Sequence, residues 1–450
     1  MNKTIFLLLT ILLNLPTLSA QQNTSRWSIN DQGGVTWKIE DRIPHHDHME
    51  MSGKKISAVV SYGVESDNSF FVKRDLVWPM LRTIPNNTHA SLMHAFSDDI
   101  IKSIKIDGSI VNEKVTEISL DGTIEVKSLI GEDIELTRTF FPSTEMPVYY
   151  EKYVIFNRSD KSIKIDIPEL EKVIITEKKK GVDGEYSLTY KISGGGKSVL
   201  KDGESLYFSL SITGEKDGEN YTYSDVEREL KNRKSLIDQL WSNLILETPD
   251  IVLNRGFAFA KIRASESIYQ TKGGPMHGPG GLSYYAAIWA NDQAEYVNPF
   301  FPYLGYDYAN ESVINSFEHF ARFMNDKYEP IPSSIIAEGI DIWNGAGDRG
   351  DAAMIAYGAA RFAMSYGDRD AAKKLWPLIE WCLEYNHRKL NKHGVVASNT
   401  DELEGRFPTG KANLCTSSLY YDALLSAAWL GKSLGKDEKL LNTYRLEAIR

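Results

Sequence analysis

Three carboxylic acids crowd into one short segment near the C-terminal end of the sequence. Asp401, Glu402 and Glu404 lie within four residues, and Arg406 follows them. Carboxylates this close repel one another, which tends to raise the pKa of at least one of them into the range of a proton donor. The arginine offsets part of that repulsion. On spacing alone, a solvated acidic loop that caps the next helix is the favoured alternative.

Trp289 and Asp292 form a second candidate pair. They are three residues apart, and helical spacing would place both on one face near the start of a helix. A tryptophan face can stack on the C–H groups of a sugar ring, and a carboxylate accepts hydrogen bonds from paired hydroxyls. A core tryptophan beside a helix-capping aspartate explains the same pattern equally well.

A third group lies after Trp343, in a glycine-flanked run that contains Asp348, Arg349 and Asp351. We expect Asp348 and Arg349 to bind substrate hydroxyls, together with the nearby Trp343. Asp351 is expected to be a first-turn acid, a position that the helix dipole favours. The tripeptide at 349–351 also matches an integrin-binding motif, which we dismiss at a helix start.

Metal chemistry is not indicated. His45, His46 and His48 cluster with acidic neighbours, a composition that can bind metal, but an exposed polar turn is the favoured interpretation. Cys382 and Cys415 are the only cysteines, so a four-cysteine zinc site and a disulfide scaffold are excluded. One bridge between these two remains open in an oxidising compartment. We predict neither a bound metal nor a cofactor.

The N-terminal twenty residues have the pattern of a secretory signal peptide. Lys3 precedes the apolar run Ile5–Leu15, Pro16 interrupts it, and Ala20 is a small residue at the expected cleavage position. No later segment reaches the length of a membrane helix, so the mature protein is expected in the periplasm or outside the cell, away from the membrane. The net charge of −10 argues against nucleic acid as a partner.

Period-two alternation predicts an all-β domain over residues 21–223. Ile163, Ile165 and Ile167 alternate with charged residues, which places one face of a strand on a core and the other toward water. Asp-Gly turns such as 121–122 separate the runs. Many strands without intervening helices imply an antiparallel β-sandwich.

The period changes to that of helices after this domain. Residues 224–247 read as one linker helix, capped by Ser224 or Asp225 and packed between the two parts. Residues 248–450 read as helical hairpins rich in alanine and glycine. We expect helices over 250–271, 282–304, 311–326, 350–366, 369–391 and 412–434, and the start of another at 437.

With these elements in this order, the chain resembles the six-hairpin glycosidases, which pair a β-sandwich and a linker helix with an (α/α)6 barrel. Glucoamylases, trehalases, processing α-glucosidases and α-L-rhamnosidases share that barrel. The resemblance covers nearly the whole mature chain and is most specific in the loops at 278–292, 347–351 and 399–408. No subfamily is assigned.

The resemblance implies that the barrel is incomplete at its C-terminal end, because this chain supplies about half of the expected helices. Exposed faces of the first and last helices would then lack partners. We therefore expect the natural gene to continue past Arg450, with about five further helices and a second catalytic carboxylate.

Site residues also follow from the resemblance. In relatives of this fold the acid lies in the loop between the fifth and sixth helices, which here carries the three clustered carboxylates. Glu404 is the first choice, because Gly405 leaves its surroundings open to a ligand, and Glu402 is the second. Asp401 and Arg406 are expected to bind substrate. The family's base lies near the last helix pair, so no residue of this chain is assigned to it.

The predicted function is a glycoside hydrolase that cleaves an oligo- or polysaccharide by carboxylate acid/base catalysis. A glycoside phosphorylase is the enzymatic alternative, and it would need a phosphate site near the base. A carbohydrate-binding protein without catalysis is the alternative from another class. Turnover of glycosides, phosphate-dependent release of a sugar phosphate, or binding alone would separate the three.

Overall fold

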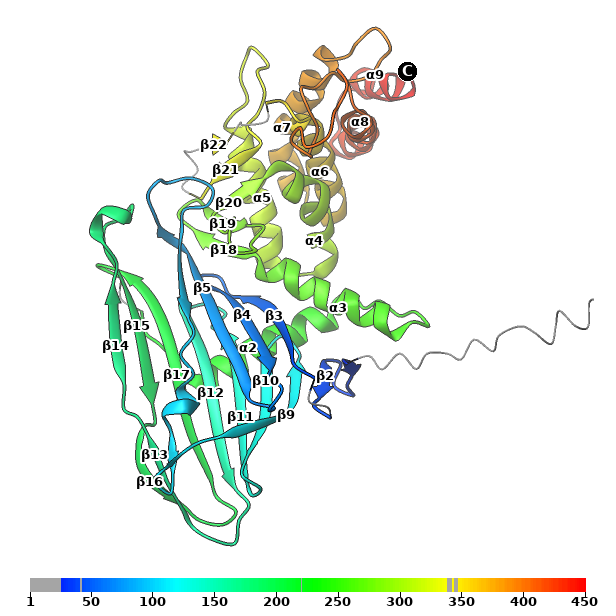
Figure 1. Cartoon of the computed structure of the whole chain (residues 1–450). Helices are drawn as coiled ribbons and strands as arrows, with labels where there is room; N and C mark the ends of the chain where they lie inside the picture. Colours follow the sequence, from blue (N-terminus) through cyan, green and yellow to red (C-terminus); the bar gives the residue numbers. More distant parts are fainter. Residues whose placement is uncertain (1–25, 41–42, 220, 338–341, 344–346) are drawn as a thin grey trace, which may run out of the picture.

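The computed structural model places an all-β part before a mainly helical part, in the order expected from the sequence (Figure 1). The structure describes residues 26–40, 43–219, 221–337, 342–343 and 347–450. The predicted signal peptide lies outside these residues. Within the described ranges, no helix is both long enough and apolar enough to cross a membrane.

Two antiparallel sheets make up most of the β part. The larger has nine strands in the order β1-β2-β9-β10-β11-β12-β17-β15-β14, and the second has the order β3-β4-β5-β6. The strands of the first are β1 (Ser28–Ile29), β2 (Val35–Lys38), β9 (Glu113–Leu120), β10 (Ile124–Ile130), β11 (Ile134–Pro142), β12 (Val148–Asn157), β14 (Glu171–Ile175), β15 (Tyr186–Ser193) and β17 (Ser205–Lys216). Those of the second are β3 (His45–Ser52), β4 (Ser57–Val64), β5 (Phe70–Arg82) and β6 (Ser91–Phe96). A smaller sheet joins β16 (Gly196–Leu200), β13 (Ile163–Ile167), β7 (Lys105–Ile106) and β8 (Ser109–Ile110).

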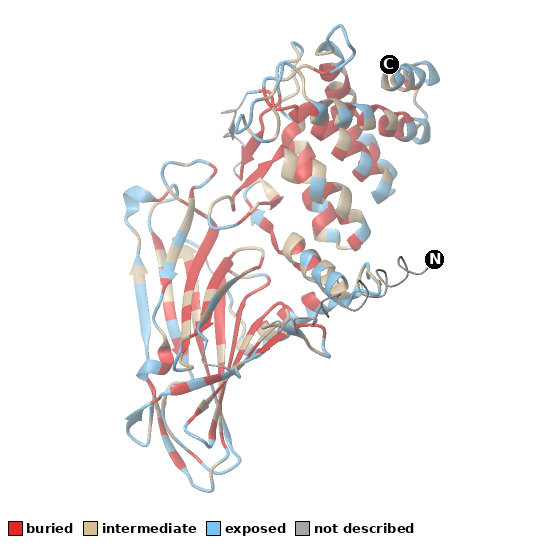
Figure 2. Cartoon of the chain, turned by 45° about the vertical axis from the view of Figure 1, so that its right-hand side comes forward, coloured by how far each residue is buried: buried red, intermediate tan, exposed pale blue. Residues whose placement is uncertain are grey.

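Alternating apolar side chains fill the space between the two main sheets. Val126 of β10 and Leu210 of β17 belong to the same buried cluster as Ala58 of β4 and Leu76 of β5. Since inward-facing residues of both sheets share one core, the expected sandwich is the arrangement that buries both apolar faces. Figure 2 shows this buried layer in red along the inner strands.

A charge network is sealed inside this core. Arg74 and Glu151 are both fully buried and form a two-pronged ion pair. Arg138, also fully buried, binds Asp99 through Nη1 at 3.0 Å and contacts Glu113. Charges this deep are tolerated only when paired, so each partner is needed by the other.

Strand β4, in the middle of the second sheet, is buried on both faces, whereas period-two alternation predicts one face toward water. In β4 every residue except Ser61 is buried. The reason is that the outer face carries the helical part: Val77 of β5 packs with Tyr269 and Tyr285 in a separate buried cluster. The sandwich therefore serves as a platform for the loops that follow.

The linker helix α2 (Val226–Ser242) ties the two parts together. Asp225 caps it by accepting from the amide of Arg228, as expected. Arg233, fully buried, donates to the carbonyls of Gly122 at 2.7 Å and Ser52 at 3.0 Å, and forms an ion pair with Glu266. The helix thus bonds both to the sandwich and to the first helix of the next part.

The helical part is built around α6. Its helices are α3 (Ile251–Glu266), α4 (Asn298–Leu304), α5 (Asp307–Ala321), α6 (Asp351–Tyr366), α7 (Arg369–Arg388), α8 (Leu414–Leu434) and α9 (Glu438–Ile449). Helices α4, α5, α7 and α8 pack on α6, α9 packs on α8, and α3 packs on the linker helix α2. Alanine-rich α6 is buried along most of its length, because small side chains allow helices on several sides. Sheets followed by helices are confirmed, while closure into an (α/α)6 barrel remains a prediction.

Three predicted helices are partly wrong. The linker helix expected over 224–247 ends at Ser242, and two later helices change to strands. The segment 250–271 leaves the helix after Glu266 and forms a hairpin of β18 (Ile268–Thr271) and β19 (Gly274–His277). The segment 282–304 becomes helical only from residue 290, because Ala287–Trp289 forms β20. Strand β20 pairs with β21 (Ser334–Ile336), which pairs with β22 (Ile342–Trp343). A short buried apolar run has no periodicity that separates strand from helix.

Candidate active site

A buried arginine is the centre of the candidate site. Arg349 is 1% exposed and reaches four side chains. Its Nη1 donates to Oε1 of Glu404 at 3.1 Å, and its Nη2 donates to Asp351 at 2.9 Å and to Asn291 at 3.3 Å. Its Nε donates to Ser333 at 3.0 Å. The guanidinium therefore joins a loop, two helix starts and the strand region before β21.

The acidic loop is held against this arginine by its backbone. The amides of Asn399 and Thr400 donate to the carbonyl of Asp348 at 2.9 and 3.1 Å. At the other end, the side chain of Asn413 caps α8 and donates to Ser398 at 2.7 Å. The loops at 347–351 and 399–408, which the sequence selected separately, are thus one structural unit.

Glu404 stands on a strained turn. Its φ is +59°, a region that residues other than glycine and asparagine rarely occupy. The carboxylate lies between Arg349 and Arg406, whose Nη2 is 3.6 Å from Oε2. At Gly405, a Cβ would meet nothing nearer than 3.9 Å, so the expected open space beside Glu404 is present. Strained backbone persists where its surroundings enforce it, as at functional sites.

A second carboxyl pair lies close by. Carboxylate atoms of Glu295 and Glu402 and the thiol of Cys415 lie within 4.8 Å of one another. Tyr296 donates its hydroxyl to Glu402 at 3.3 Å. Such a grouping of described residues could hold a metal ion, although acidic groups often cluster without one. It can equally share a proton between two carboxyls.

Burial favours the protonated form of two of these acids. The pKa of Glu295 is raised to about 8, first by burial and then by the charge of Glu402 and a hydrogen bond to it. Burial also raises the pKa of Asp292, against the opposing effect of Arg349. Glu295 therefore retains a proton near neutral pH beside a second carboxyl, which is the arrangement that a general acid needs.

Asp292 and Glu295 owe their position to an unusual helix start. Residues Asp292–Val297 form a π-helical turn that continues into α4. Such turns occur mostly as single-turn insertions in α-helices and are frequent at functional sites. Trp289 precedes the turn in β20, so the prediction that Trp289 and Asp292 share one helical face is wrong.

Trp289 is nevertheless next to the arginine. Its ring lies 5.9 Å from Cζ of Arg349 and makes an edge-to-face contact with Tyr284 at 5.5 Å. The ring is only 8% exposed. Its large face is therefore mostly engaged by the protein, with a small part left accessible.

Asp348 and Asp351 are used within the protein. Asp348 is 4% exposed, accepts from the amide of Gly350 at 2.9 Å and accepts from the hydroxyl of Tyr385. Asp351 is the first residue of α6, as expected, and accepts from Ser333 at 2.9 Å. At Gly350 a Cβ would lie 2.3 Å from Thr416, so this turn requires glycine. These contacts align the loop that carries Arg349.

Three predicted site residues remain, and each has a different environment. Asp401 accepts from the amide of Leu403 at 2.9 Å and so shapes the acidic loop. Arg406 is largely exposed. Trp343 lies in β22, and its side chain is outside the described residues.

The structure decides between the alternatives for the histidine cluster and for the two cysteines. His45, His46 and His48 belong to strand β3 rather than to the expected polar turn, and His46 pairs with Glu65 at 3.1 Å. Cys382 and Cys415 are free thiols, so the bridge left open by the sequence is not formed. The histidines do not join the candidate site, whereas the thiol of Cys415 lies beside Glu295 and Glu402 in it.

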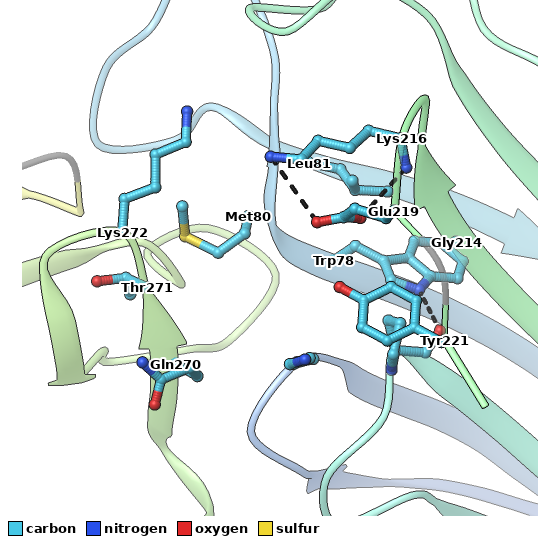
Figure 3. A pocket seen from close by; sticks show the side chains of 12 residues that line it. Trp78, Met80, Leu81, Gly214, Lys216, Glu219, Tyr221, Gln270, Thr271 and Lys272 are labelled. Carbon is cyan, nitrogen blue, oxygen red and sulfur yellow. Dashed lines mark hydrogen bonds and ion pairs between the residues drawn. The ribbon is translucent and has the colours of Figure 1, made fainter. Parts of the chain in front are cut away.

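A separate cavity of about 220 Å³ lies where the sandwich meets the hairpin β18–β19 (Figure 3). Trp78 and Tyr221 form part of its wall, and Lys55, Lys216 and Lys272 line it. Its one acid, Glu219, forms an ion pair with Lys216 at 3.8 Å. Among its described lining residues Glu219 is the one carboxyl.

No family model matches the chain, and no curated protein matches it. Among solved structures it is similar to a bacterial glucoamylase complexed with acarbose, with a TM-score of 0.47 and 11% identity over 91% of this chain and 66% of that chain. It is similar to a family 105 glycoside hydrolase of C. acetobutylicum ATCC 824, with a TM-score of 0.32 and 15% identity over 49% and 61% of the two chains. It is also similar to a rhamnosidase from Klebsiella oxytoca with rhamnose bound, with a TM-score of 0.34 and 10% identity over 90% and 69%.

This chain therefore spans about two thirds of the length of each of these structures. Glucoamylase and rhamnosidase are two of the enzyme classes that the sequence resemblance named. At such identities and TM-scores the similarity assigns no subfamily and no residue roles.

Proposed function

We propose that this protein is a glycoside hydrolase whose proton donor lies in the acidic loop. The observation that carries the proposal is the convergence of four carboxyl groups from two elements around Arg349. Glu402 and Glu404 come from the loop, and Asp292 and Glu295 come from the π-helical turn. Glycosidic cleavage needs one protonated and one ionised carboxyl, and this cluster offers both.

The proposal assigns the proton to the pair of Glu295 and Glu402. The proton shared with Glu295 would pass from Glu402 to the glycosidic oxygen while the C–O bond to the leaving sugar breaks. Water would form the new C–O bond from the opposite side of the sugar and give one proton to a carboxylate base that is not assigned to a residue of this chain. Glu404, between Arg349 and Arg406, is bound by guanidinium groups, which suit a carboxylate. The contacts thus favour the pair of Glu295 and Glu402 over Glu404 as the donor, the reverse of the order expected from the loop sequence.

Substrate binding is proposed for the other residues that the sequence selected. Arg349, Asp292 and Asp401 lie at the carboxyl cluster or in the loop that carries it, and Arg406 lies at its exposed edge. Trp289 offers the accessible part of its ring, and Trp343 is included from its place in β22. Asp348 would act through the loop, since its own carboxylate is occupied. The substrate class is an oligosaccharide with several hydroxyls to satisfy.

The test is a panel of α- and β-linked aryl glycosides and oligosaccharides. Glu402→Gln should lower kcat/KM by about 10²–10⁴ while sugar still binds, because an amide has no proton of suitable acidity to give. Glu185→Gln, at an exposed glutamate of the sandwich, is the matched control. Complete lack of turnover by the folded wild-type protein across the panel would contradict the proposal.

The same panel separates the alternatives. Release of a sugar 1-phosphate only when phosphate is added would identify a phosphorylase. Binding by calorimetry without turnover, unaffected by Glu402→Gln, would identify a carbohydrate-binding protein.

We further propose that residues 1–20 direct export and are removed. Lys3, the apolar run and Ala20 are the features that support it. N-terminal sequencing of the protein from the periplasm or medium of its host should begin at Gln21. An intact Met1 on protein retained in the cell would contradict this.

A further inference from the structure

A loop of the β-sandwich reaches the loops that carry the candidate site. His89 lies in the connection between β5 and β6 and is exposed. Its ring centre is 4.4 Å from that of Tyr284, which belongs to the helical part. Tyr284 contacts Trp289, and the Trp289 ring lies over Arg349. Successive contacts therefore lead from His89 to the arginine that holds the carboxyl cluster.

The sandwich loop is built to hold its shape. The buried Arg82 donates to the carbonyl of Asn87 at 2.7 Å and to Oδ1 of Asn86 at 3.1 Å. The amide of His89 donates to Oδ1 of Asn87 at 2.9 Å, and the hydroxyl of Thr88 lies 3.2 Å from Nδ1 of His89. An aromatic ring fixed in advance loses little conformational entropy when a ligand stacks on it.

The sandwich also positions the opposite side of the contact. Glu50 of β3 accepts from the amide of Gly281 at 3.3 Å and from the hydroxyl of Tyr285 at 3.0 Å, and Arg263 lies 3.3 Å from it. Leu282, between these residues, has a φ of +69°. Glu50 therefore fixes a strained turn directly before Tyr284.

From these contacts we propose that His89 and Tyr284 form a sugar-stacking platform for the part of the substrate beyond the bond that is cleaved. The proposal rests on the proposed glycosidase function. Both residues are partly accessible, and they come from different parts of the chain. Contacts within the protein hold both rings in place without a ligand. Trp289, nearer to the carboxyls, is almost fully covered. A longer oligosaccharide would contact the platform, and a short aryl glycoside would not reach it.

The experiment compares two substrates. His89→Ala should raise KM for the oligosaccharide that the wild-type protein turns over by about 3–10-fold, and should change kcat/KM for the matching aryl monoglycoside by less than about twofold. His89→Tyr, which keeps an aromatic ring, should restore most of the oligosaccharide KM. His48→Ala, at an exposed histidine of β3, is the control and should change neither. Equal effects of His89→Ala on both substrates, or no effect, would overturn the proposal.

Calorimetry with the same oligosaccharides distinguishes failure of the stacking platform from failure of the glycosidase function. If the wild-type protein binds a sugar without turnover and His89→Ala weakens that binding, the glycosidase function fails and the platform stands. If turnover occurs and binding is indifferent to His89, the platform fails and the function stands. No binding of any oligosaccharide by the wild-type protein overturns both.

Discussion

Replacing Glu295 with glutamine should make the protein more stable in alkaline solution and leave it unchanged in acid. The folded pKa of Glu295 is raised to about 8 by burial and by Glu402, above its ordinary value of 4.5. Between these values the folded protein keeps a proton that the unfolded chain releases, so wild-type stability falls as pH rises through this window. Above the folded pKa the carboxylate is buried and charged, and the full penalty applies. Glutamine has no proton to lose.

The size of the stability difference follows from the pH range between the two pKa values. Each pH unit in which only the folded form holds the proton lowers the free energy of unfolding of the wild-type protein by about 1.4 kcal/mol. Glu295 is only partly buried, and solvent screening reduces the total to about 1–2 kcal/mol at pH 9. For a helical part of this size, that amount corresponds to a melting midpoint higher by about 2–8 °C. At pH 4 the two proteins should melt together.

Differential scanning calorimetry at pH 4, 6, 7.5 and 9 measures this, with a chelator present so that no adventitious cation neutralises the pair. Glu185→Gln should follow the wild-type curve throughout. An identical difference between wild type and Glu295→Gln at all four values would refute the raised pKa. The alkaline limb of kcat/KM should also disappear or move in the variant, because the proposed donor pair loses its shared proton.

Three further outcomes are expected. Glu404→Gln should lower kcat by about tenfold or more while shifting unfolding free energy by less than about 1 kcal/mol, since its ion pairs are partly exposed; a large loss of stability measured by urea unfolding would contradict this. Glu151→Gln should cost about 3–5 kcal/mol in the same assay, because it leaves the fully buried Arg74 without its charged partner. Glu50→Ala should raise KM for oligosaccharides by releasing the turn before Tyr284, and should also lower the melting midpoint because it removes the partner of Arg263 and two hydrogen-bond acceptors; a KM equal to wild type would count against that role.

Local signals in the sequence predicted most elements of the fold. Asp225 and Asp368 cap their helices with their side chains, and Gly367 ends α6 with a φ of +71°, as their residue types require. In β13, Ile163, Ile165 and Ile167 are buried, and the lysine and aspartate between them are not. These features depend on a few neighbouring residues, which is why the sequence determines them.

The errors lie where distant segments decide the outcome. The apolar run before residue 290 forms strand β20 because β21, about forty-five residues later, pairs with it. Strand β4 is buried on both faces because the helical part packs on the outer side of its sheet, where Tyr269 and Tyr285 cluster with Val77 of the neighbouring strand β5. Neither partner can be recognised from the local pattern.

The candidate site likewise has residues that the sequence predicted and one that it missed. Residue types and spacing selected the loops at 347–351 and 399–408, and backbone hydrogen bonds from Asn399 and Thr400 to Asp348 join them. Glu295 was missed, although it follows Asp292 by three residues, because an isolated glutamate carries no signal. Its importance arises from a π-helical turn and from burial beside Glu402.

What the sequence determined by itself is thus the order of strands and helices, the caps and the chemistry present in each loop, since these depend on short-range periodicity and residue type. Only the tertiary structure decided which acid has its pKa raised and which aromatic rings of distant segments meet. A pKa and an exposed ring face depend on desolvation and on groups far away in the chain. His89 illustrates this best, since it lies in the sandwich and meets Tyr284 across nearly two hundred residues.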